Sequence, residues 1–312
     1  MKESPTDGRR VEQAMIRNNL DKAPRADLAE PGDRCRDTLA DLLREASRIL
    51  AQCSGSARLD AELLLSEAVG GDRTLLYAHS DRIPTAAQRE RFEQLVLRRR
   101  RGEPIAYLLG RKEFWSLTLA VGPGVLTPRP ETELLVERSL AREPGGRARV
   151  LDLGTGSGAI ALALAIERPD WKITATDVDA ETLRTANGNM KRLGAINVNL
   201  KQGDWFGAVE GERFDLVVGN PPYVEAGDPN LESLKYEPRQ ALVSGGDGLR
   251  DIRRIVSQAP EHLAGGWLLL EHGATQGDAV RALFVERGFS GVGTLKDPAG
   301  HDRVTEGRWP QR

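Results

Sequence analysis

Hydrophobic residues recur at helical spacing in the first third of the chain. After residue 38 the apolar positions fall at i, i+3, i+4, i+7, i+10 and i+11, which predicts an amphipathic helix; they are Leu39, Leu42, Leu43, Ala46, Ile49 and Leu50. A second apolar block covers 60–69 and ends at Gly70 and Gly71. Thr85 and Gln88 have the spacing of a capping box before a third helix. This pattern predicts a small helical bundle over 37–102.

The pattern then changes from helical spacing to alternation. Residues 114–121, FWSLTLAV, alternate apolar and polar positions as a strand does, and the GPG at 122–124 is expected to form a hairpin turn. In the next segment, LTPRPETELLVE, Pro130 is expected in the first turn of a helix. We interpret residues 111–132 as a hairpin that forms a hinge between two domains.

From Arg149 onward, short apolar runs alternate with helical patterns. Strands are predicted at 149–153, 172–176, 197–201, 214–218, 267–271, 289–295 and 303–307. Helices are predicted at 159–168, 180–193, 247–263 and 277–287. Such alternation indicates an α/β, doubly wound and mostly parallel sheet of seven strands. The last two strands have no helix between them and are expected to form a closing hairpin.

Composition narrows the class of protein. The chain has 312 residues, which favours one large domain plus a smaller one, and its net charge of −2 argues against a globally basic nucleic-acid binder. A local basic patch stays open, because RRRR at 98–101 is either a solvated helix end or a docking site for an acidic or RNA-bearing partner. Cys35, Cys53 and the four histidines have no metal-ligand spacing, so no metal is expected.

Apolar run length and the composition of the N-terminal residues bear on membrane insertion and secretion. No run of 18 apolar residues occurs, so no transmembrane helix is expected. Residues 1–36 are rich in charged residues, proline and glycine, and they lack the apolar core of a signal peptide. We predict a mostly disordered extension, in which 11–20 is the stretch with helical character.

A glycine loop follows the first strand of the α/β region. In VLDLGTGSGAIALALA the three glycines allow a tight turn and close approach of a ligand, and the helix N-terminus offers free N–H groups. The loop comprises Gly154, Thr155, Gly156, Ser157 and Gly158. Its spacing, G-x-G-x-G, meets the dinucleotide fingerprint only in part, because residue 159 is alanine. The alternative is a turn that needs its glycines only for packing.

Asp177 sharpens the interpretation of this loop. It ends the next predicted strand, where its carboxylate could accept both hydroxyls of a ribose, in charge-assisted bonds worth ~1.5–3 kcal/mol each. With no phosphate-gripping Lys or Ser/Thr after the loop, S-adenosylmethionine is favoured over ATP. Asp204 and Trp205, in GDWF after the third strand, are candidates to contact the adenine amino group and ring. The alternatives are a strand-end turn residue for Asp177 and a half-buried core aromatic for Trp205.

The segment FDLVVGNPPYV is the fourth strand of this region and its exit. At the point where strand order reverses, a crevice is expected, which places Asn220 beside the cofactor. The Asn220 side-chain oxygen and the Pro221 carbonyl could orient a planar amino or amide nitrogen for attack, and Pro221 and Pro222 would fix their direction. Tyr223 could pack against the planar target group. No general base is required before attack. The alternative is a rigid Pro-Pro turn.

Seven motifs occur in an order that resembles one family. They are TPRPETE, DLGTGSGAIALALA, GDWF, FDLVVGNPPYV, YEP, GWLLLEHG and DRVTEGR. Over about 37–308 the chain is similar to the peptide chain release factor glutamine methyltransferases, the HemK/PrmC family. The resemblance implies a Rossmann-like class I methyltransferase fold at 133–312, with a release-factor-recognition domain at 37–110. It implies N5-methylation of the glutamine in the GGQ loop of class 1 release factors.

The resemblance also assigns site residues. Cofactor binding falls to 154–158, Asp177, Trp205 and Asn220, and substrate binding to 220–223, with Asn220, Pro221 and Tyr223 catalytic. Arg129 and Glu131 would help close the cofactor site. Independently of the resemblance, we expect a cytoplasmic monomer that binds neither membrane nor nucleic acid stably; the cofactor product would be S-adenosylhomocysteine. The segment VEAGDPNLESLKYEP departs from the family's usual, longer form, which affects the shape of the loop over the substrate.

Three other functions compete with this one. NPPY also occurs in DNA adenine and some RNA methyltransferases, so a nucleic-acid amino-methyltransferase of the same fold is the main alternative. Such an enzyme would carry a target-recognition domain or a basic face, whereas the residues after Asn220 are used in completing the sheet. An NAD-dependent oxidoreductase fits the glycine spacing poorly, and a non-catalytic binding module would not need an intact NPPY.

Overall fold

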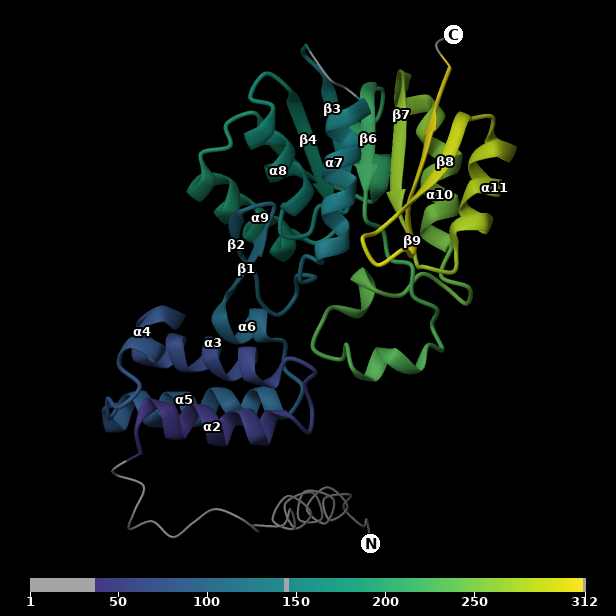
Figure 1. Cartoon of the computed structure of the whole chain (residues 1–312). Helices are drawn as coiled ribbons and strands as arrows, with labels where there is room; N and C mark the ends of the chain where they lie inside the picture. The colour runs from purple at the N-terminus through teal and green to yellow at the C-terminus, as the bar shows by residue number, and fades with distance from the viewer. Residues whose placement is uncertain (1–36, 143–145, 311–312) are drawn as a thin grey trace, which may run out of the picture.

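The computed structural model describes residues 37–142 and 146–310. The extension expected at 1–36, including Cys35 and the stretch 11–20, lies outside the described residues. Figure 1 shows a helical unit below an α/β unit, with a two-stranded hairpin between them. Among the described helices, none is long and apolar enough to span a membrane.

The helical unit contains three main helices and two short ones. They are α2 (Leu39–Leu50), α3 (Ala57–Val69), α4 (Arg73–Ala78), α5 (Ala86–Arg100) and α6 (Ile105–Leu109). The predicted capping box at Thr85 and Gln88 is confirmed, and Thr38 forms a second one with Asp41. The apolar faces of α2, α3 and α5 meet in a core of their own. The two short helices were not predicted, because five or six residues carry too little periodic signal.

The hairpin between the two units turns earlier than the sequence indicated. Its strands are β1 (Arg111–Phe114) and β2 (Leu117–Ala120), paired antiparallel. The turn lies at Trp115 and Ser116, whose φ values of 50° and 59° suit a two-residue hairpin turn. The prediction of one strand over 114–121 with a turn at 122–124 was therefore wrong. Trp115 is held in this unusual backbone by bonds to Glu133 (2.9 Å) and Glu167 (2.8 Å), both distant in sequence.

The α/β unit has seven strands in the order β5-β4-β3-β6-β7-β9-β8. Their bounds are β3 (Arg149–Leu153), β4 (Lys172–Asp177), β5 (Val198–Gln202), β6 (Phe214–Gly219), β7 (Leu263–Glu271), β8 (Ser290–Lys296) and β9 (Asp302–Arg308). Strands β3 to β7 pair in parallel, while β9 runs antiparallel between β7 and β8. The predicted doubly wound sheet and its closing hairpin are confirmed.

Helices cover both faces of this sheet (Figure 1). The helices are α7 (Glu133–Arg142), α8 (Ala159–Glu167), α9 (Ala180–Leu193), α10 (Arg250–His262) and α11 (Gly277–Arg287). One buried cluster joins α7 and α8 to the sheet, and a second joins α10 and α11 to its other face. The strand order reverses between β3 and β6, so the carboxyl ends of these two strands form the switch point at which ligands bind in such sheets.

One buried side chain connects the hairpin to the glycine loop. Asn189, on α9, is fully buried, and its Oδ1 accepts a hydrogen bond from the backbone N–H of Ala120 at 2.8 Å. Its Nδ2 donates to the Ala120 carbonyl at 3.0 Å and to the Ser157 carbonyl at 2.8 Å. Strand β2 and the loop that follows β3 are therefore fixed to the same amide.

The segment between β6 and α10 extends away from the sheet toward the helical unit (Figure 1). It contains the short 3₁₀ turns Pro229–Glu232 and Arg239–Ala241. The Tyr236 hydroxyl donates to the Arg101 carbonyl at 3.3 Å, and its ring packs on the small cluster that contains Tyr107. Glu237 accepts from the Thr127 N–H at 3.1 Å and from the Arg129 guanidinium. The motif YEP thus joins this segment to the helical unit and to the chain leading into α7.

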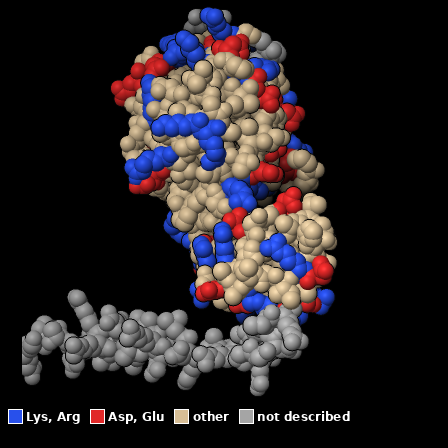
Figure 2. Space-filling model, turned by 90° about the vertical axis from the view of Figure 1, so that its left-hand side faces the viewer, with Lys and Arg blue, Asp and Glu red and all other residues tan. Residues whose placement is uncertain are grey.

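Charge on the face shown in Figure 2 is mixed. Lys and Arg side chains alternate there with Asp and Glu around wide uncharged areas, and over the described residues of that view they do not merge into one basic surface. Two of the four arginines at 98–101 are neutralised, because Arg98 pairs with Glu103 and Arg99 pairs with the buried Asp60. These pairs favour the structural interpretation of half of the arginine run.

Candidate active site

A cavity of about 480 Å³ opens at the carboxyl ends of β3 and β6. Nine residues singled out by sequence line it, and they are Gly154, Thr155, Gly156, Ser157, Asp177, Asp204, Trp205, Asn220 and Pro222. Arg129 lines it as well, whereas Gly158, Pro221, Tyr223 and Glu131 are not among the lining residues. The fold therefore brings the glycine loop, the end of β4 and the NPPY loop to one cavity.

The glycine loop takes a backbone that other residues adopt rarely. Gly154, Gly156 and Gly158 have φ values of 69°, 59° and 86°. A side chain at Gly154 would stand 3.3 Å from the Trp205 ring, on the wall of the cavity. One at Gly158 would instead meet Leu162 at 2.9 Å, inside α8. The first two glycines border the ligand space, and the third permits close packing of the helix that starts at residue 159.

Asp177 is held at the end of β4 by backbone amides. Its Oδ2 accepts from Gly156 N–H and its Oδ1 from Asp179 N–H, each at 3.0 Å. Burial raises the pKa of Asp177, and these two hydrogen bonds oppose the rise. Each oxygen has a further lone pair, so the carboxylate can also accept from a ligand in the cavity.

We expect Asp177→Ala to weaken S-adenosylmethionine binding by about 10–100-fold, at ~1.4 kcal/mol per decade. The physical reason is the loss of both the ribose acceptor and the bond that positions Gly156. Isothermal titration calorimetry on the purified variant measures this change. Asp170→Ala, at an exposed turn, is the matched control; an Asp177→Ala protein that binds as tightly as this control would remove Asp177 from the site.

Trp205 and Asp204 line the cavity next to the glycine loop. Trp205 has a φ of 52°, and its partly buried ring packs against the core cluster beneath while also facing the cavity. The ring is thus partly a core aromatic, and its stacking on an adenine ring stays a prediction. Asp204 forms an ion pair with Arg254 at 2.6 Å, and both side chains line the cavity. Any ligand group that bonds to Asp204 shares that carboxylate with Arg254.

The NPPY loop presents its amide in a defined direction. Asn220 Nδ2 donates to Thr132 Oγ1 at 3.2 Å, which leaves Oδ1 as the acceptor toward the cavity that Asn220 lines. Pro221 is buried, and the Tyr223 hydroxyl donates to Glu271 Oε1 at 3.2 Å. Burial, followed by the nearby charge of Glu271, raises the pKa of Tyr223 above its usual range. Tyr223 is therefore a hydrogen-bond donor and not a base.

Three residues of this site were missed as functional candidates. Thr132 and Glu271 hold the NPPY side chains, and Glu237 holds Arg129 at the cavity. All three lie in motifs that were quoted for the family resemblance without a role. The available signal was position, because Glu271 is an acid at the end of an apolar strand, as Asp177 is. Over the described residues, no group of three His, Cys, Asp or Glu side chains is placed to hold a metal ion.

The strand order, the glycine loop and the cavity at the switch point define a class I S-adenosylmethionine-dependent methyltransferase. Residues 41–110 match the family model of the PrmC N-terminal domain, and residues 130–250 match that of the methyltransferase small domain. The chain belongs to the release factor glutamine methyltransferase family.

Two relatives support this membership. The release factor glutamine methyltransferase of Pseudomonas aeruginosa is 54% identical over 259 residues, which are 82% of this chain and 94% of that protein. The Escherichia coli protein of the same name is 47% identical over 272 residues, or 86% and 98% of the two chains. Among solved structures, the hMettl16 catalytic domain has a TM-score of 0.52 at 17% identity, covering 67% of this chain and 80% of that one, and it supports the fold alone.

Proposed function

We propose that this protein transfers a methyl group from S-adenosylmethionine to the side-chain amide nitrogen, N5, of the glutamine in the GGQ loop of class 1 release factors. The observation that carries the proposal is the fixed amide of Asn220, which lies beside the glycine loop with its oxygen as the available acceptor. Membership of the release factor glutamine methyltransferase family supports the choice of substrate.

The residues of the cavity fit the cofactor. Gly154 lets the Trp205 ring pack closely against the glycine loop at the edge of the cavity, and Asp177 supplies acceptors that line it. The bound sulfonium supplies an electrophilic methyl group. These residues would hold the adenosine portion, and Asn220, which lines the same cavity, would face the reacting groups.

The substrate amide nitrogen is a poor nucleophile because its lone pair is delocalised into the carbonyl. Asn220 Oδ1 and the Pro221 carbonyl accept its two N–H groups and favour a geometry in which the lone pair faces the methyl group. Fixing this alignment in advance can supply ~7–11 kcal/mol of the barrier. Pro221 and Pro222 keep the acceptors in place at little entropic cost. The nitrogen becomes acidic only after methylation, so no base is needed before attack.

We propose a separate role for each of the three parts of the chain. The helical unit, 37–110, would recognise the body of the release factor, the hairpin segment, 111–132, would act as the linker, and 133–312 would carry catalysis. We further propose that the protein acts as a cytoplasmic monomer without a metal, does not bind nucleic acid stably, and releases S-adenosylhomocysteine. The mixed charge in Figure 2 and the paired Arg98 and Arg99 support a protein substrate over a nucleic acid.

The substrate assignment has a direct test. With labelled S-adenosylmethionine and a class 1 release factor, we expect label in the factor at a stoichiometry near one, and no label when the GGQ glutamine is replaced by alanine. Mass spectrometry of the GGQ peptide locates the added methyl group. Label that persists on the alanine factor would overturn the assignment, and label on neither factor would exclude release factors as substrates.

A further inference from the structure

The two polar side chains of the NPPY loop converge on one buried carboxyl. Glu271, at the end of β7, is fully buried, and its Oε1 accepts from the Tyr223 hydroxyl at 3.2 Å. Thr132, which is 4% exposed, receives Asn220 Nδ2 at 3.2 Å and lies near enough to the same carboxyl to lower its pKa. Glu271 thus bonds to Tyr223 directly, and the hydroxyl that holds Asn220 lies beside the same carboxyl.

The donors and acceptors of these groups determine the direction of each hydrogen bond between Glu271, Thr132 and Asn220. A threonine hydroxyl has one proton, so an Oγ1 that accepts from Asn220 must donate its own proton elsewhere. The neighbouring Glu271 carboxyl, whose Oε2 has no hydrogen-bond partner in the described part of the chain, is the acceptor available for that proton. Asn220 is then held with Nδ2 toward Thr132 and Oδ1 away from it. The acceptor that the substrate amide requires is therefore selected by a group that the substrate does not touch.

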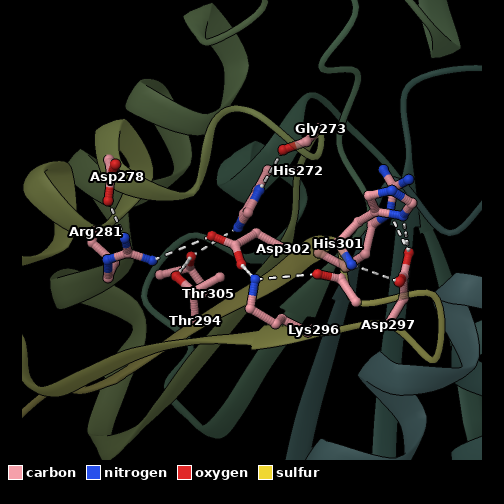
Figure 3. A network of polar contacts seen from close by, with 12 residues as sticks. His272, Gly273, Asp278, Arg281, Thr294, Lys296, Asp297, His301, Asp302 and Thr305 are labelled. Carbon is pink, nitrogen blue, oxygen red and sulfur yellow. Dashed lines mark hydrogen bonds and ion pairs between the residues drawn. The ribbon is translucent and has the colours of Figure 1, made fainter.

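The backbone that carries Glu271 is fixed by its neighbours. Figure 3 shows His272 between the Gly273 carbonyl and Thr305, to which its two ring nitrogens lie at 2.9 Å each. Gln276 accepts from Gly273 N–H at 2.9 Å and donates to the Tyr223 carbonyl at 3.0 Å. The Gln276 side chain therefore joins the end of β7 to the NPPY loop, in addition to the Glu271 carboxyl.

The Glu271 carboxyl is buried, and few charged groups act on it. Burial raises the pKa of Glu271 to about 7, while hydrogen bonds from Thr132 and Tyr223 oppose the rise. Two further charges act on it, since Glu131 raises its pKa and Arg303 lowers it. Its Oε2 has no hydrogen-bond partner among the described residues. A buried carboxyl with an unpartnered oxygen lowers stability, so Glu271 is a costly side chain for the fold to hold at this position.

We propose that Glu271 is a positioning residue for methyl transfer, which acts through Thr132 and Tyr223 to hold the Asn220 amide with its oxygen toward the substrate. The proposal rests on the proposed function, because it assigns Glu271 to the same reaction. The substitution E271Q tests the proposal. The NH₂ group of the new glutamine side chain needs an acceptor, and the Thr132 hydroxyl can accept from it. Thr132 would then donate its own proton to Asn220 Oδ1, so the Asn220 amide would turn and Oδ1 would no longer face the cavity.

The experiment compares four variants with the wild-type enzyme: E271Q, T132V, T132S and the double variant E271Q/T132V. For E271Q and T132V we expect kcat to fall by about 10–100-fold, as a small misplacement of a reacting group does. The KM for the release factor and the Kd for S-adenosylmethionine should stay within about threefold of wild type. T132S keeps the hydroxyl, so its kcat should stay within about threefold of wild type. The double variant should be no slower than E271Q, because both changes interrupt the same series of contacts from Glu271 to Asn220.

A second readout does not depend on turnover. In ¹⁵N-labelled protein, the side-chain NH₂ resonances of Asn220, identified by their loss in N220A, should shift in E271Q and T132V and stay near wild type in T132S. If the wild-type enzyme methylates no release factor, the proposed function fails while this readout still decides the direction of the amide. The proposal is overturned if E271Q retains near-normal kcat, if T132S is as slow as T132V, or if the Asn220 resonances are the same in every variant. If E271Q does not fold, the two Thr132 variants carry the same test.

Discussion

Asn220→Ala should abolish measurable turnover, a loss of more than about 10³-fold in kcat. The substitution removes the acceptor oxygen that faces the cavity and the donor that anchors it to Thr132. No other side chain of the NPPY loop can replace this acceptor, because Tyr223 points its hydroxyl at Glu271. Single-turnover rates with labelled S-adenosylmethionine and a release factor measure the loss.

The fold should survive this change. Asn220 is only partly buried, and alanine fits its backbone, so we expect the melting temperature and the Kd for the cofactor to remain close to wild type. Asn199→Ala, at an exposed position of the edge strand β5, is the matched control and should turn over normally. An Asn220→Ala enzyme within tenfold of this control would refute the hydrogen-bonding role.

Gly154→Val should weaken S-adenosylmethionine binding by at least about 100-fold, or ~2.8 kcal/mol. The φ of 69° at this position disfavours any L side chain, and a β-branched one most of all. Its Cβ would lie 3.3 Å from the Trp205 ring, closer than ordinary packing, and would displace a ring that lines the cavity. Titration calorimetry measures the affinity, and turnover at a fixed cofactor concentration should fall in parallel.

The control for this change separates backbone strain from loss of space. Gly194 has a φ of 66° at the exposed end of α9, and a Cβ there meets no atom within 4 Å. Gly194→Val therefore carries similar strain without entering the cavity. It should lower the melting temperature yet leave cofactor affinity unchanged. Equal losses of affinity in both variants would show that strain, and not the space beside Trp205, explains the Gly154 result.

The sequence predicted the α/β unit well because strands and helical patterns alternate in it, and because central strands such as β3 and β6 are short apolar runs that end at or just before a glycine. It failed at the hairpin, where Trp115 adopts a positive φ because Glu133 and Glu167 bind it from outside the segment. Strand β7 begins at Leu263, four residues before its predicted start, because α10 passes into it without a loop. Such features depend on contacts between distant segments, which local periodicity does not contain.

The candidate site also has a part that the sequence predicts and a part that depends on contacts between distant segments. Glycines, Asp177 and Asn220 follow strand ends, so topology alone predicts that they meet, and the cavity brings them together. The connection of Asn220 to Glu271 through Thr132 joins three separate strand and helix ends. No spacing in the sequence encodes which hydroxyl faces which amide, because that depends on side-chain packing. The cofactor and substrate roles of the individual residues stay predictions until the variants above are measured.

Asn189 gives the two halves of the reaction a common frame of reference. A hairpin strand that leads to the helical unit and the loop beside the cofactor are bonded to one amide, so they share its position. The three hydrogen bonds of Asn189 would therefore help to fix the position of a release factor, docked on the helical unit, relative to the cofactor. Little relative movement would remain between the surface that selects the substrate and the atoms that react. Positional accuracy at the methyl group then originates in part from a residue that neither substrate contacts.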